Sequence, residues 1–115
     1  TPEYNQSIPG VVKNFIDWLS RSEPDVLAGK PVAILGATQG SWGTRLAQAA
    51  VRQTLAACGA LLMPLPHLYI ARAADKFDAE GQLVDEPTGT SLTQFLESFR
   101  DWIQAMPRHE PRERK

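Results

Sequence analysis

The stretch PVAILGATQGSWGTRLAQAAVRQTLAACGALLM, residues 31–63, decides the fold. Its first five residues form an apolar run that lacks alternation and stops at Gly36, which predicts a strand covered on both faces. Apolar and small residues then recur at helical spacing from Leu46 to Cys58, and Gly59 follows where a left-handed helix terminus is expected. A second apolar run, residues 60–63, comes next. A strand, a helix and a strand in close succession predict a right-handed crossover between parallel strands, so the fold class is α/β.

Two further amphipathic helices are expected, one on each side of this unit. The first has Ser7 as its expected cap and Pro9 in its first turn, and its buried face consists of Val11, Val12, Phe15, Ile16 and Leu19. For the last helix, Ser91 and Gln94 match a capping box, and the apolar face consists of Leu92, Phe95, Leu96, Phe99, Ile103 and Met106. Residues 64–90 form a long excursion with an extended piece near 68–71, and the tail 107–115 is expected to be disordered.

The composition favours a single soluble domain with neither a nucleic acid nor a membrane as partner. The 115 residues are 43% hydrophobic, and 12 Lys and Arg stand against 13 Asp and Glu, so no global field attracts a polyanion. The apolar stretches are shorter than the roughly 20 residues of a membrane-spanning helix, and no basic and apolar leader precedes them. The single cysteine, Cys58, suits a reducing compartment. We therefore expect a cytoplasmic protein, and the spacing of His67 and His109 supports no metal site.

The expected strands are too few for a complete sheet. Two parallel strands with three helices make a marginal sheet, whereas ordinary sheets have about five or six strands. A parallel sheet buried on both faces also needs neighbours on either side. Because the sequence opens directly on a loop at Thr1, we expect a further strand to end just before it. The sequence thus predicts the C-terminal part of a larger doubly wound domain.

Three segments carry a resemblance to a known family. PEYNQSIPGVVKNFIDWLSR at 2–21, GKPVAILGATQGSWGTRLAQ at 29–48 and FDAEGQLVDE at 77–86 resemble successive signatures of the NADPH-dependent FMN reductase family, which includes quinone, chromate and azo-dye reductases. The resemblance extends to about Met106, so residues 1–106 are expected to form the C-terminal part of a flavodoxin-like domain. It implies a parallel sheet in the order 2-1-3-4-5, with FMN outside the carboxyl ends of the strands. It also implies an upstream half, with a Ser- and Arg-containing loop for the FMN phosphate.

The resemblance implies that the opening loop lines the isoalloxazine ring, through the positions matching Pro2, Glu3, Tyr4 and Asn5. The residue types are suitable, because proline stiffens a loop, tyrosine offers a flat wall, and asparagine can donate and accept hydrogen bonds. On composition alone, a plain turn before a capped helix is the simpler interpretation.

A second set of flavin contacts is implied in the loop GATQGSWGT, residues 36–44. The family contacts match Ala37 best, then Thr38, and Gly40 is a further candidate in the same loop. The glycine spacing fits neither a dinucleotide nor a triphosphate motif. Backbone amides and a helix N-terminus at this loop could stabilise negative charge on a reduced flavin. Trp42 can face the nicotinamide nucleotide or a partner subunit, and Arg45 is one candidate cation for a 2′-phosphate.

The resemblance implies an FMN-dependent NAD(P)H oxidoreductase. Hydride passes from NADPH or NADH through FMN to quinone-like or other small electrophilic acceptors, and no side chain needs to act as acid, base or nucleophile. The family further implies a homodimer or homotetramer. Two alternatives stay open: a flavodoxin-type electron carrier, against which the net charge of −1 argues mildly, and a truncated fragment without catalytic activity.

Overall fold

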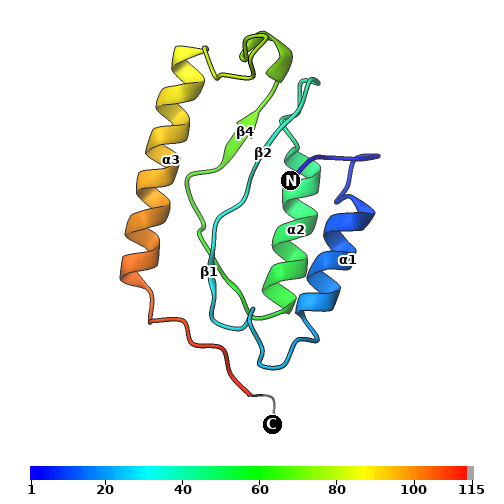
Figure 1. Ribbon diagram of the computed structural model, residues 1–115, viewed down its shortest axis with the longest axis vertical. Helices are drawn as coiled ribbons and strands as arrows, with labels where there is room; N and C mark the ends of the chain where they lie inside the picture. Colours follow the sequence, from blue (N-terminus) through cyan, green and yellow to red (C-terminus); the bar gives the residue numbers. More distant parts are fainter. Residues whose placement is uncertain (114–115) are drawn as a thin grey trace.

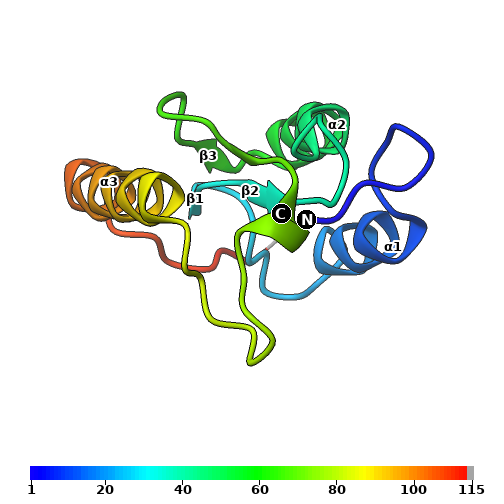
Figure 2. The ribbon, with the colours of Figure 1, turned by 90° about the horizontal axis from the view of Figure 1, so that it is seen from above.

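Short parallel strands form the middle layer of the structure, and helices cover both of their faces (Figures 1 and 2). The computed structural model describes residues 1–113. Figure 2 shows α3 on one side of the strands and α1 with α2 on the other. Along the chain the elements are α1 (Gly10–Leu19), β1 (Pro31–Val32), β2 (Leu35–Ala37), α2 (Arg45–Ala57), β3 (Leu61–Leu62), β4 (Leu68–Ile70), the 3-10 turn η1 (Ala73–Asp75) and α3 (Glu86–Ala105).

The strands pair in parallel, as the sequence predicts. Strand β1 pairs with β3, and β2 pairs with β4 in a register that places Ala37 opposite Ile70. The prediction that the strand ends at Gly36 is wrong, because β2 continues to Ala37. A Cβ on Gly36 would collide with the side chain of Thr44 and would lie 2.5 Å from the carbonyl oxygen of Thr1. The glycine therefore permits a close approach inside the strand and does not end it.

The connection between β3 and β4 is longer than the connection between β1 and β2, a difference that the sequence does not predict. Two residues, 33–34, separate β1 from β2, whereas five residues, 63–67, separate β3 from β4. The longer connection contains Pro64 and Pro66, which cannot donate ladder hydrogen bonds, and Leu65, which is 70% exposed. The extended piece expected near 68–71 is β4 and belongs to the sheet.

The apolar run 31–35 is covered on both faces, as expected. Val32 and Ile34 pack in a cluster with α1 and α2, whose buried members include Ile16, Val51 and Leu55. Ala33 and Leu35 pack in a second cluster that contains Met63, Leu68, Ile70 and Phe95. Successive strand side chains point to opposite faces, so an unbroken apolar run is what a doubly covered strand requires.

Both expected helix starts are wrong. The residue before α1 is Pro9, with no side-chain cap, and Ser7 instead exchanges backbone hydrogen bonds with Tyr4. Helix α3 begins at Glu86, and its cap is Asp85, six residues before the expected cap Ser91. Pro87 lies in the first turn of α3, which tolerates a residue without an N–H. Gly59 does follow the C-cap of α2, with a φ of +77°.

The predicted apolar helix faces are only partly buried. In α1, Ile16 is buried, and Val12 and Leu19 pack against the core, but Val11 and Phe15 are 73% and 62% exposed. In α3, Phe95 is 1% exposed, whereas Leu96 and Ile103 are about half exposed. In each helix the apolar stripe is therefore wider than the buried face, and part of the stripe is not covered by other residues among 1–113.

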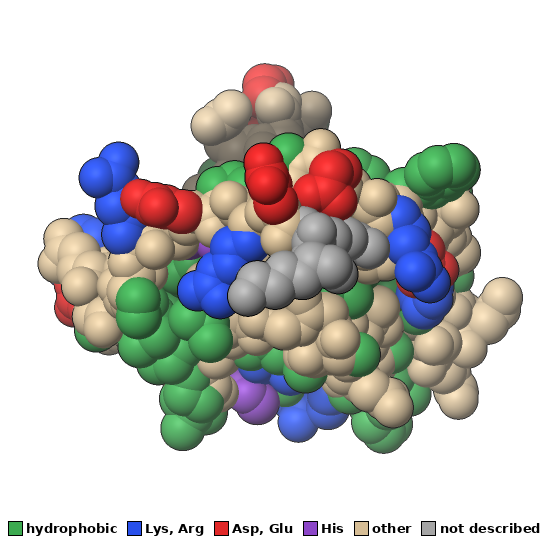
Figure 3. All heavy atoms as spheres, turned by 90° about the horizontal axis from the view of Figure 1, so that it is seen from below, with side chains coloured by type: hydrophobic (Ala, Val, Ile, Leu, Met, Phe, Trp, Pro, Cys, Tyr) green, Lys and Arg blue, Asp and Glu red, His purple; other side chains and the backbone are tan. Residues whose placement is uncertain are grey.

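The segment after α3 lies at the end of the structure opposite the carboxyl ends of β2 and β4 (Figure 1). Residues 107–113 contain no helix or strand, and Arg112 exchanges backbone hydrogen bonds with Asp25 at 2.7 and 3.2 Å. Residues 114–115 of the tail expected to be disordered lie outside the described residues. Acidic and basic side chains are interspersed over this end (Figure 3). None of the helices within residues 1–113 has the length and apolar character needed to cross a bilayer.

Candidate flavin site

Two loops meet where β2 and β4 end. Thr38 N donates to Ile70 O, and Thr38 O accepts from Ala73 N, each at 2.9 Å. Arg72 N donates to Gly40 O, also at 2.9 Å. These three hydrogen bonds fasten the start of the loop after β2 to the chain after β4. They hold Thr38 and Gly40 at the carboxyl end of the strands, where open parallel sheets bind ligands.

The opening segment lies against the same end of the structure. The amino nitrogen of Thr1 donates to Leu35 O at 2.8 Å, on the edge of β2 opposite β4. Glu3 Oε2 accepts a hydrogen bond of 2.8 Å from Ala47 N, in the first turn of α2. Figure 1 shows this segment beside β2 and the start of α2. The structure thus brings residues 1–5 to Ala37, the last residue of β2, and to the following loop with Thr38 and Gly40, although more than 30 residues separate the two segments.

A tight turn presents the aromatic residue of the opening segment to solvent. Tyr4 and Ser7 exchange backbone hydrogen bonds of 3.2 and 3.1 Å. Asn5 and Gln6 between them have φ values of +51° and +62°, which is the left-handed pair of a type I′ turn. Asparagine adopts this conformation readily, and glutamine does so at a cost. Tyr4 is 59% exposed, and Pro2 and Asn5 are also exposed, so these side chains are free to meet a ligand.

The start of α2 contains a buried polar side chain that the sequence analysis missed. Gln48 is fully buried, and its Nε2 donates to Leu68 O at 2.9 Å and to Thr44 Oγ1 at 3.1 Å. Its Oε1 is buried without a partner among the described residues. Gln48 lies among apolar helix positions, and its role depends on contact with β4, which helical periodicity does not reveal. This hydrogen bond joins α2 to β4.

Arg45 contacts a residue of β4. Its guanidinium carbon lies 4.3 Å from the centre of the Tyr69 ring. The Tyr69 hydroxyl forms a 2.7 Å hydrogen bond with His67 Nδ1. Trp42, in the preceding loop, is 60% exposed. The cation–π contact depends on the register of β4 against β2, so the sequence alone offers no signal for it.

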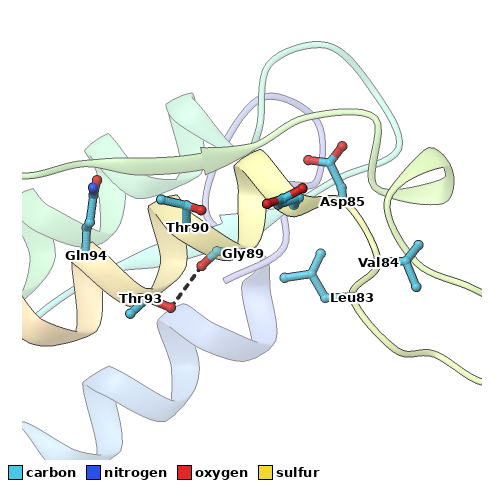
Figure 4. A pocket seen from close by; sticks show the side chains of 8 residues that line it. Leu83, Val84, Asp85, Gly89, Thr90, Thr93 and Gln94 are labelled. Atoms are coloured by element: carbon cyan, nitrogen blue, oxygen red, sulfur yellow. Dashed lines mark hydrogen bonds between the residues drawn. The ribbon is translucent and has the colours of Figure 1, made fainter.

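A groove of about 430 Å³ lies beside the first turn of α3 (Figure 4). None of the seven predicted flavin residues lines it. At its rim, Asp85 accepts hydrogen bonds from the hydroxyl and the backbone N–H of Thr88 and lies 3.7 Å from Lys76 Nζ. These contacts, with the Thr88 hydroxyl first, hold the pKa of Asp85 below its ordinary value. The groove is therefore a feature of the helix cap, separate from the predicted flavin loops. Within residues 1–113, no three His, Cys, Asp or Glu side chains gather closely enough to hold a metal ion.

The sequence of these segments identifies the family to which the chain belongs. A model of the family described as NADPH-dependent FMN reductase matches residues 1–75, which include the opening segment, the loop after β2 and all of α2. This chain belongs to that family. The match contains all seven predicted flavin residues.

Relatives in the family are about 40% identical. An NAD(P)H-dependent FMN reductase of Pseudomonas aeruginosa is 42% identical over 92% of this chain and 57% of its own length. A 2-hydroxy-1,4-benzoquinone reductase of a Burkholderia species is 41% identical, over 90% of this chain and 57% of its length. A quinone reductase of Escherichia coli K12 is also 41% identical, over 90% of this chain and 56% of its length. The chain therefore spans a little over half the length of these curated relatives.

A solved structure shares the fold. FerB, a flavoenzyme NAD(P)H:(acceptor) oxidoreductase from Paracoccus denitrificans, matches with a TM-score of 0.83 at 40% sequence identity. The match covers 92% of this chain and 59% of FerB. The chain thus shares with FerB its arrangement of parallel strands between α3 on one side and α1 and α2 on the other.

Proposed function

We propose that this chain is part of an FMN-dependent NAD(P)H oxidoreductase that passes hydride from NAD(P)H through FMN to quinone-like acceptors. One observation carries the proposal: residues 1–5 and 36–40, the two segments with the predicted flavin contacts, lie together at the carboxyl end of β2. The relatives known as FMN reductase and quinone reductase carry out the same chemistry, which supports the proposal.

The residues present fit a flavin. Tyr4, Asn5 and Ala37 are exposed at one end of the strands, so a flat ring can reach them without moving the core. Gly40 has no atom closer than 3.9 Å to the place of a Cβ, which leaves room for a ligand. Pro2, Tyr4 and Asn5 would contact the ring from the opening segment. Ala37, Thr38 and Gly40 would contact it from the end of β2 and the loop after it. Bound FMN supplies the acceptance and release of hydride, which no side chain supplies.

In this proposal, the chain's own residues bind and orient the flavin. The hydrogen bond from Thr38 N to Ile70 O, and those from Arg72 N and Ala73 N to the carbonyl oxygens of Gly40 and Thr38, fix Thr38 and Gly40 before any ligand arrives. Preorganised loops reduce the ordering cost of binding. No side chain is assigned as acid, base or nucleophile.

The finer features of the domain belong to the proposal as well. They are the strand order 2-1-3-4-5, residues 1–106 as the C-terminal part of the domain, and an upstream half that holds the FMN phosphate. We further propose that the protein is cytoplasmic and forms a homodimer or homotetramer. In that order β1 and β2 form strand four, and β3 and β4 form strand five.

Flavin titration and rapid mixing test the function. The full-length protein, which includes the proposed upstream half, is titrated with FMN, and the bound form is mixed with NADPH or NADH without oxygen while the oxidised flavin absorbance is followed. A benzoquinone is added afterwards. We expect the absorbance to be lost with NAD(P)H and restored by the quinone. A protein that binds FMN but is not reduced by NAD(P)H would be an electron carrier, and one that binds no FMN would be a non-catalytic fragment.

A variant at Gly40 separates binding from folding. Because the space beside Gly40 is open, Gly40→Leu should leave the melting temperature of the ligand-free protein unchanged. The bulky side chain should nevertheless weaken FMN binding strongly. Gly10→Leu is the matched control, because no atom lies within 4 Å of its Cβ place and Gly10 is outside the predicted flavin loops. Unchanged FMN affinity in the Gly40 variant would exclude this loop from the site.

A further inference from the structure

The first turn of α2 lacks the cap that its own sequence would provide. Thr44 precedes the helix at a φ of +62° and makes no side-chain capping bond. Its hydroxyl oxygen instead accepts from Gln48 Nε2. The first amides of any helix have no acceptor inside the helix, so Ala47 N must find one elsewhere.

Glu3 supplies that acceptor from the opening segment. Its Oε2 lies 2.8 Å from Ala47 N, across 44 residues of sequence. A carboxylate at a helix N-terminus is stabilised both by the hydrogen bond, which is charge-assisted, and by the helix dipole. The positive end of α2, which could otherwise attract a negative ligand, is already occupied by this side chain.

The contact also determines where the turn Tyr4–Ser7 lies. Before Glu3, Thr1 is held on Leu35 of β2. After the turn, Pro9 is buried and its carbonyl oxygen accepts from Lys13 N in α1. The side chains of Tyr4 and Asn5 are themselves exposed, with no side-chain hydrogen bond among the described residues. Glu3 is therefore the last residue before the turn that forms a hydrogen bond with α2.

We propose that Glu3 is a positioning residue, which clamps the opening segment onto α2 and so fixes Pro2, Tyr4 and Asn5 relative to the loop after β2. Its contribution to the flavin site is then indirect, because its carboxylate is bound to the helix. The proposal concerns the same site as the proposed function and rests on it for the flavin readout. The clamp itself has a readout that needs no flavin.

Three variants of Glu3 distinguish the clamp from a general loss of charge. Glu3→Ala removes the acceptor, Glu3→Asp keeps the charge but shortens the reach, and Glu3→Gln keeps an acceptor at the same distance. Glu86→Gln is the matched control, since Glu86 is an exposed carboxylate in the first turn of α3. Glu3→Gln also covers the case in which Glu3→Ala does not fold.

Amide exchange measures the clamp without flavin. In the unsubstituted protein we expect protection at Ala47, Tyr4 and Ser7, measured by hydrogen–deuterium exchange at residue resolution. Glu3→Ala and Glu3→Asp should lose protection at all three amides, whereas Glu3→Gln and Glu86→Gln should retain it. Protection at Tyr4 and Ser7 that is unchanged in Glu3→Ala would overturn the proposal, whether or not the protein binds FMN.

Flavin affinity measures the consequence of the clamp. At a temperature where all variants are folded, Glu3→Ala should bind FMN about tenfold more weakly, a factor equivalent to about 1.4 kcal/mol. Glu3→Gln should restore most of the affinity, a rescue that a role based on charge would not give. Affinity in Glu3→Ala equal to that of the unsubstituted protein would overturn the positioning role. If the unsubstituted protein binds no FMN, the proposed function fails, and the exchange experiment alone decides the clamp.

Discussion

Gly43 combines a positive φ with a close backbone neighbour, so a single methyl group there should lower the stability of the structure. Its φ is +60°, and a Cβ there would lie 2.7 Å from both the carbonyl carbon and the Cβ of Tyr69 in β4. A left-handed conformation costs a residue other than glycine about 1–2 kcal/mol. Forcing extra atoms into a packed contact adds about 1–3 kcal/mol. Gly43→Ala should therefore lower the free energy of unfolding by roughly 2–5 kcal/mol, a large share of the 5–15 kcal/mol typical of a domain.

Two other glycines separate the contributions to this loss. Gly81 has a φ of +79° but open space around it, so Gly81→Ala should show only the conformational cost of about 1–2 kcal/mol. Gly40 has neither a positive φ nor a close neighbour, so Gly40→Ala should be neutral or stabilise by up to about 1 kcal/mol. Urea unfolding of the three variants measures the series. If Gly43→Ala lost no more stability than Gly81→Ala, the close approach of α2 to β4 would be of no energetic consequence.

Three further outcomes are expected. Phe95→Ala should cost about 3–5 kcal/mol in urea unfolding, because Phe95 is 1% exposed, whereas Leu96→Ala, at 51% exposed, should cost far less. Gln48→Met should cost about 1–3 kcal/mol in the same assay, because it leaves the carbonyl oxygen of Leu68 without its buried donor. The lowered pKa of Asp85 means that its stabilising effect is present above the ordinary value of 3.8 and is lost as pH falls through the folded-state pKa. The melting temperature should thus fall more steeply below that pH in the unsubstituted protein than in Asp85→Asn, and equal slopes would contradict this assignment.

The class of fold could be predicted from the sequence because its main signals are local. The apolar run at 31–35 has no alternation since both faces are covered, and Gly59 has a positive φ at the helix end where it is expected. The start of α3 could not be placed in the same way. Its cap, Asp85, lies between segments rich in Gly and Pro, and Pro87 is compatible with either a loop or a first helical turn.

The candidate site was predictable only as two separate segments. The resemblance indicates the residues of each segment, but their proximity depends on Thr1 lying on β2 and Glu3 on α2. Gln48 was not singled out and Arg45 was interpreted without its partner, because Leu68 and Tyr69 lie on β4, whose register against β2 the sequence does not reveal. Contacts that depend on strand register are invisible to helical or strand periodicity.

The start of α2 is the element on which the geometry of the site depends. Gly43 and Gln48 join it to β4, the hydroxyl of Thr44 serves Gln48, and Glu3 joins it to the opening segment. A change on any of these contacts therefore moves a loop relative to the helix while leaving the two apolar clusters intact. It follows that a substitution of Glu3, which belongs to neither cluster, should alter flavin affinity at a smaller cost in stability than a substitution of Ile34 or Phe95, which lie within the clusters themselves.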